Sequence, residues 1–126
     1  MSRSRSAAAA PRLRREASAR QGLHDSAPVF AALGDETRLQ IVARLCAEGP
    51  LSITRLSEGA GVTRQAITKH LNALSAAGLA KNVKSGREQI WELEVRRLEM
   101  ARRCLDRISD QLDVAIARLK ALVEDT

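Results

Sequence analysis

Residues 61–78 read GVTRQAITKHLNALSAAG, and this stretch decides the fold. Its apolar residues recur at the spacing of one helix face, and they are Ala66, Ile67, Leu71 and Leu74. Thr63 stands just before them, where a side-chain oxygen can accept a bond from an unpaired backbone N–H. Gly78 can adopt the left-handed conformation that ends a helix. The stretch therefore predicts an amphipathic helix over residues 63–77.

A shorter helix is predicted immediately before this one, over residues 53–58. Ser52 can cap it, and Ile53 and Leu56 mark its inner face. The turn Gly59-Ala60-Gly61 separates it from the longer helix. Two helices joined by a tight turn that contains glycine make a helix-turn-helix.

Two more helices are predicted toward the N-terminus. A short apolar helix begins near Pro28 and ends at Gly34. Asp35 can cap the next helix, which Gly49-Pro50 stops. The apolar stripe of that helix is Leu39, Val42, Leu45 and Cys46. We therefore expect Cys46 to be a small core residue.

Two strands and a long helix are predicted after the helix-turn-helix. Residues 80–84 and 88–93 are rich in β-prone side chains and flank Ser85-Gly86-Arg87, which predicts a hairpin. The last helix covers residues 95–123, and its apolar positions are Leu98, Ala101, Leu105, Ile108, Leu112, Ala115, Leu119 and Leu122. Their steps of three and four form a heptad stripe, which favours packing against a second copy of the same helix. The expected fold is mainly α with a small β-hairpin: a winged helix-turn-helix with a long C-terminal dimerisation helix.

Most of the positive charge lies outside this pattern. Residues 1–22 contain six arginines and one glutamate, or +5 of the net charge of +6. They lack bulky apolar side chains, so we expect residues 1–22 to be a disordered basic tail and residues 23–126 to be the folded domain. The tail could touch DNA phosphates, and its composition also suits an organellar transit peptide. Net charge therefore carries no argument about the folded part.

The outward face of the helix over residues 63–77 carries the chemistry of base recognition. Its first two turns present hydrogen-bonding side chains and no acid, and these are Thr63, Arg64, Gln65, Thr68, Lys69 and His70. Arginine can pair with guanine and glutamine with adenine in the major groove of duplex DNA. Lys84 and Arg87 stand near the end of the hairpin, where they can contact the DNA backbone or the minor groove. A merely solvated helix face would normally mix both signs of charge.

Other classes of function lack a motif. The sequence has no glycine-rich phosphate loop, paired acid and base, or nucleophile–histidine arrangement, so we expect neither an enzyme nor a cofactor. His24 and His70 are far apart, and no Cys/His cluster suggests a metal. No apolar run reaches the ~18 residues that a membrane span needs, so we expect a cytoplasmic protein that associates with the nucleoid through DNA.

The arrangement resembles the ArsR (arsenic repressor-like) family of winged-helix regulators. The stretches that carry the resemblance are FAALGDETRLQIVARL, LSITRLSEGAGVTRQAITKHLNALSAAGL and VKSGREQIWEL. The resemblance implies a homodimer that binds a palindromic operator in double-stranded DNA and represses nearby genes. It also implies that the outward residues of the helix over 63–77 face the major groove.

The sequence departs from the metal-sensing members of that family. Those members place a Cys-x-Cys pair where this chain has residues 51–56, which contain no thiol. Another of their sites needs histidine on the last helix, which here offers only Asp106, Asp110 and Asp113. The chain resembles a subgroup without the usual metal motifs.

Two alternatives stay open at this point. Cys46 and Cys104 could form a thiol switch that responds to oxidants or reactive sulfur, although both could equally be packing residues. The winged helix could also be a protein-docking module.

Overall fold

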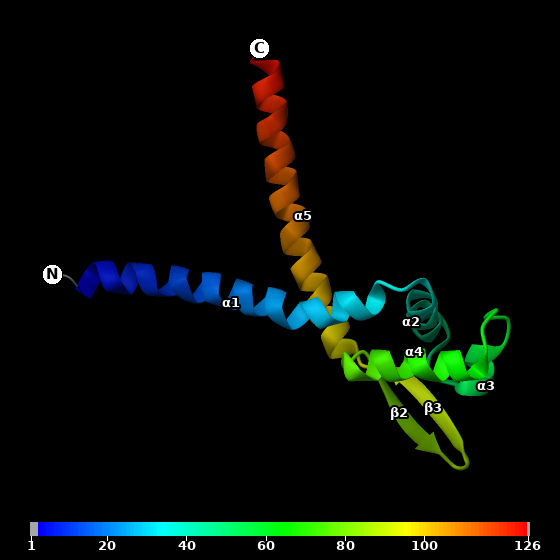
Figure 1. Cartoon of the computed structure of the whole chain (residues 1–126). Helices are drawn as coiled ribbons and strands as arrows, with labels where there is room; N and C mark the ends of the chain where they lie inside the picture. Colours follow the sequence, from blue (N-terminus) through cyan, green and yellow to red (C-terminus); the bar gives the residue numbers. More distant parts are fainter. Residues whose placement is uncertain (1–2, 126) are drawn as a thin grey trace.

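The computed structural model describes residues 3–125, and their side chains from residue 10 onward (Figure 1). Five helices and three strands follow one another as α1 (Arg3–Leu33), α2 (Glu36–Glu48), β1 (Leu51–Ser52), α3 (Ile53–Ser57), α4 (Arg64–Ala76), β2 (Ala80–Ser85), β3 (Glu88–Leu93) and α5 (Val95–Glu124). Helices α2, α3 and α4 and the hairpin form a body, from which α1 and α5 extend as two crossing arms. The predicted winged helix-turn-helix with a long last helix is confirmed.

One apolar core holds these elements together. The buried face of α4 consists of Ile67, Leu71 and Leu74, each 0% exposed. Against it pack residues from every other helix and from the sheet, among them Val29, Ile41, Leu45, Leu56, Trp91 and Ala101. Each fully buried leucine or isoleucine contributes about 1.5–3 kcal/mol of transfer free energy. The orientation of α4, and so of its outward face, is therefore fixed by the core.

Both ends of α4 have the predicted caps. The Thr63 hydroxyl accepts a bond of 3.1 Å from the backbone N–H of Ala66. At the other end the N–H of Leu79 donates to the carbonyl of Leu74, and the N–H of Gly78 donates to the carbonyl of Ser75, both at 2.9 Å. Gly78 has φ 76°, so these bonds form a Schellman ending.

Thr63→Ala is expected to destabilise the protein by about 1 kcal/mol, because it removes the oxygen that satisfies the first turn of α4. Thermal unfolding at one fixed protein concentration measures the change. Ser75→Ala is the matched control, since Ser75 is exposed in the same helix and caps nothing with its hydroxyl. Equal midpoints for the two variants would contradict the role of Thr63.

The sheet has one strand more than the sequence predicts. Strands β2 and β3 pair antiparallel from Ala80 with Leu93 to Ser85 with Glu88. Gly86, with φ 63°, takes the first position of the two-residue turn between them. The additional strand β1 pairs with the other edge of β3, with Leu51 opposite Trp91. This pairing attaches the start of α3 to the hairpin.

The N-terminal segment differs from the prediction of a disordered tail. Residues from Arg3 onward belong to α1, so the predicted boundary at residue 22 falls inside a helix. Residues 11–18 are exposed, so the helix there is stabilised by local propensity rather than by packing. Alanine and arginine are strong helix formers, and both are abundant in this segment. The first two residues of the predicted tail lie outside the described residues.

The register of α2 also differs from the prediction. Its buried face is Ile41, Val42 and Leu45, and Leu39 is 53% exposed. Cys46 is exposed as well, so its expected place in the core is wrong. Cys104, by contrast, is buried in α5 at 2% exposure.

Candidate nucleic-acid interface

The outward face of α4 begins where its buried face leaves room. Thr63, Arg64, Gln65 and Lys69 are exposed, and Thr68 is half-buried between them. The Thr68 hydroxyl donates to the carbonyl of Arg64 at 3.0 Å. Helix α4 contains no acidic residue, so its outward face is polar and cationic. The structure thus brings together five of the six residues that the sequence predicts on this face.

The sixth residue, His70, lies elsewhere. Its Nδ1 is 3.8 Å from a carboxylate oxygen of Asp35 and 3.4 Å from Nη1 of Arg38. Both partners belong to the start of α2, so His70 lies in the contact between α2 and α4. Its side chain is only 22% exposed. The prediction that His70 lies beside Arg64 and Lys69 is therefore corrected.

Asp35 is the anchor of this contact. The backbone N–H of Arg38 donates to its carboxylate at 3.0 Å and caps α2. This bond is the main reason why the pKa of Asp35 is lowered, and the charges of Arg38 and His70 add to it. The carboxylate is consequently ionised at neutral pH and can hold His70 against α2.

A hollow joins the start of α4 to the hairpin. It has a volume of about 390 Å³, and Arg64 from α4 and Arg87 from the hairpin turn both line it. Its other lining residues are Ser52, Ile53, Thr54, Glu88 and Gln89. Neither guanidinium takes part in an ion pair or hydrogen bond with the residues that the structure describes. Two unpaired cations therefore share one polar hollow beside the outward face of α4.

Ser52, Thr54 and Gln89 are polar lining residues that sequence reasoning missed. Nothing local singles them out, because they meet Arg64 only through the pairing of β1 with β3. The cap position of Ser52 was visible, but its place beside the hairpin was not.

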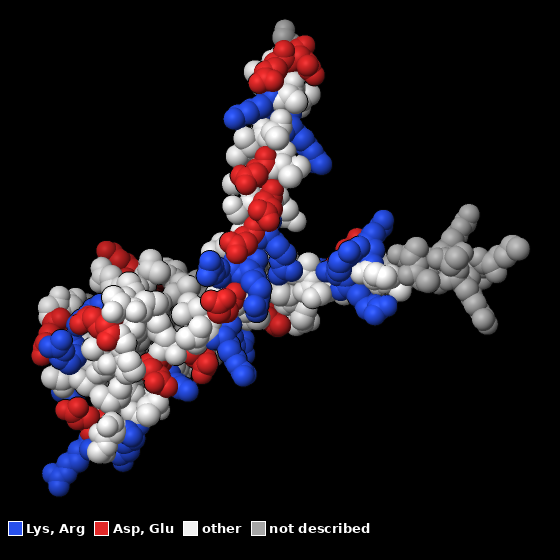
Figure 2. All heavy atoms as spheres, turned by 180° about the vertical axis from the view of Figure 1, so that it is seen from behind, with Lys and Arg blue, Asp and Glu red and all other residues white. Residues whose placement is uncertain are grey.

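The end of the hairpin is basic, as predicted. Lys84 and Arg87 are exposed there, and Figure 2 shows Lys and Arg side chains gathered at this end of the molecule. Lys81 lies further back, where its Nζ is 3.3 Å from a carboxylate oxygen of Glu92 and 3.8 Å from one of Glu94. Lys81 is thus neutralised, while Lys84 and Arg87 stay available to an anionic partner.

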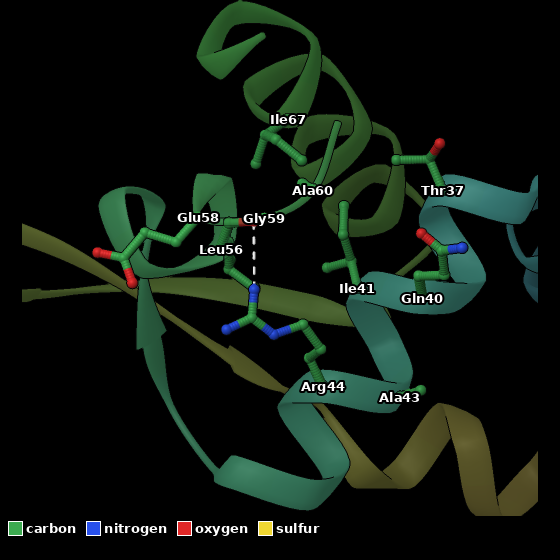
Figure 3. Close-up of a pocket in the computed structure, with 10 residues that line it drawn as sticks. All are labelled: Thr37, Gln40, Ile41, Ala43, Arg44, Leu56, Glu58, Gly59, Ala60 and Ile67. Carbon is green, nitrogen blue, oxygen red and sulfur yellow. Dashed lines mark hydrogen bonds between the residues drawn. The ribbon is translucent and has the colours of Figure 1, made fainter. Parts of the chain in front are cut away.

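A second pocket lies behind the helix-turn-helix, between α2, α3 and the turn before α4 (Figure 3). Its volume is about 460 Å³, and its walls include the buried Ile41, Leu56 and Ile67. Arg44 bridges it: Nη1 donates to the carbonyls of Arg55 and Leu56 at 3.1 and 3.3 Å. Arg44 therefore attaches α2 to the end of α3 and helps fix the turn that positions α4.

The apolar stripe of α5 divides into two parts. Leu98 packs against the core and Ala101 is 4% exposed within it, so their predicted place in a dimer interface is corrected. Beyond them Leu105, Ile108, Leu112 and Leu119 are between 45% and 62% exposed, and Ala115 and Leu122 are exposed as well. The distal part of α5 thus presents an apolar face that the body of this chain does not cover.

Within residues 3–125, no three His, Cys, Asp or Glu side chains are placed to hold a metal ion. Over the same range, no helix combines the length and the apolar character that crossing a membrane requires.

Three kinds of relative match this chain. A model of the helix-turn-helix domain matches residues 33–83. The HTH-type transcriptional regulator Rv2034 of Mycobacterium tuberculosis is 38% identical over 78 residues, or 62% of this chain and 72% of Rv2034. The solved structure of an ArsR-like transcriptional regulator from Rhodococcus sp. RHA1 is 41% identical, with a TM-score of 0.65, over 79% of this chain and 93% of the other.

A further solved structure supports the fold alone. It is the homodimeric winged helix-turn-helix DNA-binding domain of Mb0332 from Mycobacterium bovis, described as a possible ArsR-family regulator. It is 23% identical, with a TM-score of 0.55, over 71% of this chain and 82% of the other. With the helix-turn-helix, the hairpin and the long last helix in the same order, these relatives show that the chain belongs to the ArsR-like family of winged helix-turn-helix transcriptional regulators.

Proposed function

We propose that this chain forms a homodimer that binds a palindromic operator and represses transcription. The observation that carries the proposal is the outward face of α4, which is exposed, free of acids and next to a hollow with two unpaired arginines. In a helix-turn-helix the N-terminal residues of the second helix reach base edges in the major groove. Here those residues are Thr63, Arg64 and Gln65.

Arg64 and Gln65 are the proposed base readers. A guanidinium can donate two bonds to guanine O6 and N7, and a glutamine amide can pair with adenine N6 and N7. Thr68 and Lys69, one turn later, are placed for phosphates or a thymine methyl group. His70 has no part in the proposed contact, because it lies against α2.

Arg87 and Lys84 are the proposed backbone contacts of the wing. A phosphate that entered the hollow between α4 and the hairpin would meet the Arg87 guanidinium and the Thr54 hydroxyl. Contacts of this kind set the position of the protein on the duplex but carry no sequence information. Arg64 and Arg87 therefore have different expected effects when removed.

Arg87→Ala is expected to weaken binding to all DNA sequences by a similar factor. The loss of one phosphate contact should reduce the slope of log K against log salt by about 0.9. Titrations of a selected operator and of an unrelated duplex at several salt concentrations measure both effects. Lys81→Ala is the matched control, since Lys81 is on the same hairpin but paired with Glu92. A weaker operator affinity with unchanged non-specific affinity would contradict this role for Arg87.

The proposed partner in the dimer is a second copy that packs on the distal face of α5. The exposed apolar residues run from Leu105 to Leu119, and Leu112 lies midway. The first half of α5 is net basic and the second half is net acidic. Two antiparallel helices would therefore place opposite charges side by side and Leu112 at the two-fold axis. The homodimeric state named for the Mb0332 domain supports this arrangement.

A repressor controlled by a thiol pair is the less favoured form of this proposal. Cys46 is exposed on α2, but Cys104 is 2% exposed within the folded chain. An oxidant would have to displace neighbouring side chains before it reached the Cys104 sulfur. A protein-docking role is also disfavoured, since α4 shows polar rather than apolar side chains outward.

Binding-site selection with the purified protein tests the proposed function. We expect enrichment of a two-fold symmetric motif whose affinity falls steeply with salt. Enrichment of no motif, or binding that salt does not weaken, would count against operator recognition. Addition of peroxide or polysulfide to the same assay tests the thiol pair, and we expect no change.

A further inference from the structure

The crossing of the two arms contains a cleft that DNA recognition does not use. Its volume is about 490 Å³, and it is lined by Ser18 and Gly22 from α1 and by Met100, Arg103, Asp106 and Arg107 from α5. Figure 2 shows Lys and Arg side chains gathered around this crossing. We propose that the cleft binds a small phosphate ester, with Arg103 and Arg107 holding the phosphate.

Gly22 sets the position of Arg107. A Cβ atom added at Gly22 would lie 2.6 Å from Nη2 of Arg107, which is too close for a real contact. The guanidinium therefore rests directly on the backbone of α1, where only glycine leaves room for it. A guanidinium placed in this way loses little conformational freedom when it binds an anion.

The two arginines have no partner in the chain as far as the structure describes it. No ion pair or hydrogen bond is formed by Arg103 or Arg107, although Asp106 lies beside them. They are four residues apart on one helix face, where like charges destabilise the helix. A bound dianion would remove this repulsion and accept several charge-assisted hydrogen bonds.

The remaining walls indicate that the ligand carries an organic group. A cleft of this volume is larger than a phosphate needs. Met100 and the methylene stems of the arginines offer apolar surface, and the Ser18 hydroxyl offers a hydrogen bond. These features favour a phosphate monoester with an apolar substituent over inorganic phosphate.

The site is compatible with a dimer formed through α5. Arg107 lies roughly 140° around the helix from Leu112, at 100° for each residue. A second copy packed on the apolar face would therefore leave the cleft open.

Titration of the full chain with phenyl phosphate, without DNA and in phosphate-free buffer, tests the site. We expect saturable binding by calorimetry, weaker binding of inorganic phosphate and none of benzyl alcohol. Arg103→Gln and Arg107→Gln should each weaken the affinity at least about tenfold. Gly22→Val should weaken it without changing the charge, because its side chain displaces Arg107. Thermal melts of each variant verify that it is folded.

Arg102→Gln is the matched control, since it removes the same charge from α5 outside the cleft. An equal loss in this variant would show general electrostatic attraction and overturn the proposal. Absence of saturable binding of phenyl phosphate would overturn it too. If phenyl phosphate fails to bind while Arg103→Gln and Arg107→Gln weaken duplex binding, the arginines contact the DNA backbone instead.

Discussion

Leu112→Glu is expected to convert the protein to a monomer that has lost most of its affinity for a palindromic operator. Leu112 is 56% exposed in the single chain and lies midway along the apolar face of α5. The change removes about 1.5–3 kcal/mol of apolar burial from each protomer. In the antiparallel arrangement it also brings two carboxylates together at the two-fold axis, away from water. The dissociation constant of the dimer should rise at least about a hundredfold.

Light scattering across a range of protein concentrations measures this change, and operator titrations measure its consequence. Gln111→Glu is the matched control, because it introduces the same charge one position outside the apolar face. The far-UV circular dichroism of the Leu112→Glu monomer should keep its helical signal, since Leu112 contributes nothing to the core of one chain. A Leu112→Glu protein that stays dimeric would place the interface on another surface.

The elements that could be predicted from the sequence are those with local signals. Helix α4 has an apolar period, a threonine cap and a glycine ending within one stretch, and each is present in the structure. The hairpin has β-prone strands around Gly86. Strand β1 has only two residues, Leu51 and Ser52, so it has no period to detect. Its existence depends on Trp91, far along the chain.

Errors at the site also arise from contacts between distant parts of the chain. His70 follows the outward residues of α4 in sequence, but Asp35 and Arg38 draw it toward α2. The heptad stripe of α5 shows which positions are apolar, but not what covers them. Ala101 is covered by the chain's own core and Leu112 is not. Periodicity alone cannot make that distinction.

Arg64→Ala is expected to lower operator affinity by about 1–3 kcal/mol, or about 5- to 150-fold, and to relax the preference at one base pair in each half-site. Arg64 is the first residue of α4 and is exposed, and the Thr63 cap holds the turn from which it projects. A second copy in the dimer repeats the contact in the other half-site, so one substitution removes two base contacts. The loss should therefore exceed that of Arg87→Ala, which removes only backbone contacts.

Specificity rather than affinity is the decisive readout for Arg64. Binding-site selection with the Arg64→Ala protein should return the same symmetric motif with one position in each half-site degraded. Arg87→Ala should return the motif intact, because a phosphate contact is indifferent to the base. Unfolding midpoints of the two variants should match, since neither side chain forms an ion pair or hydrogen bond within residues 3–125. If Arg64→Ala weakened all sequences equally, Arg64 would be a backbone contact in the hollow that it shares with Arg87, and base reading would rest on Gln65 and Lys69.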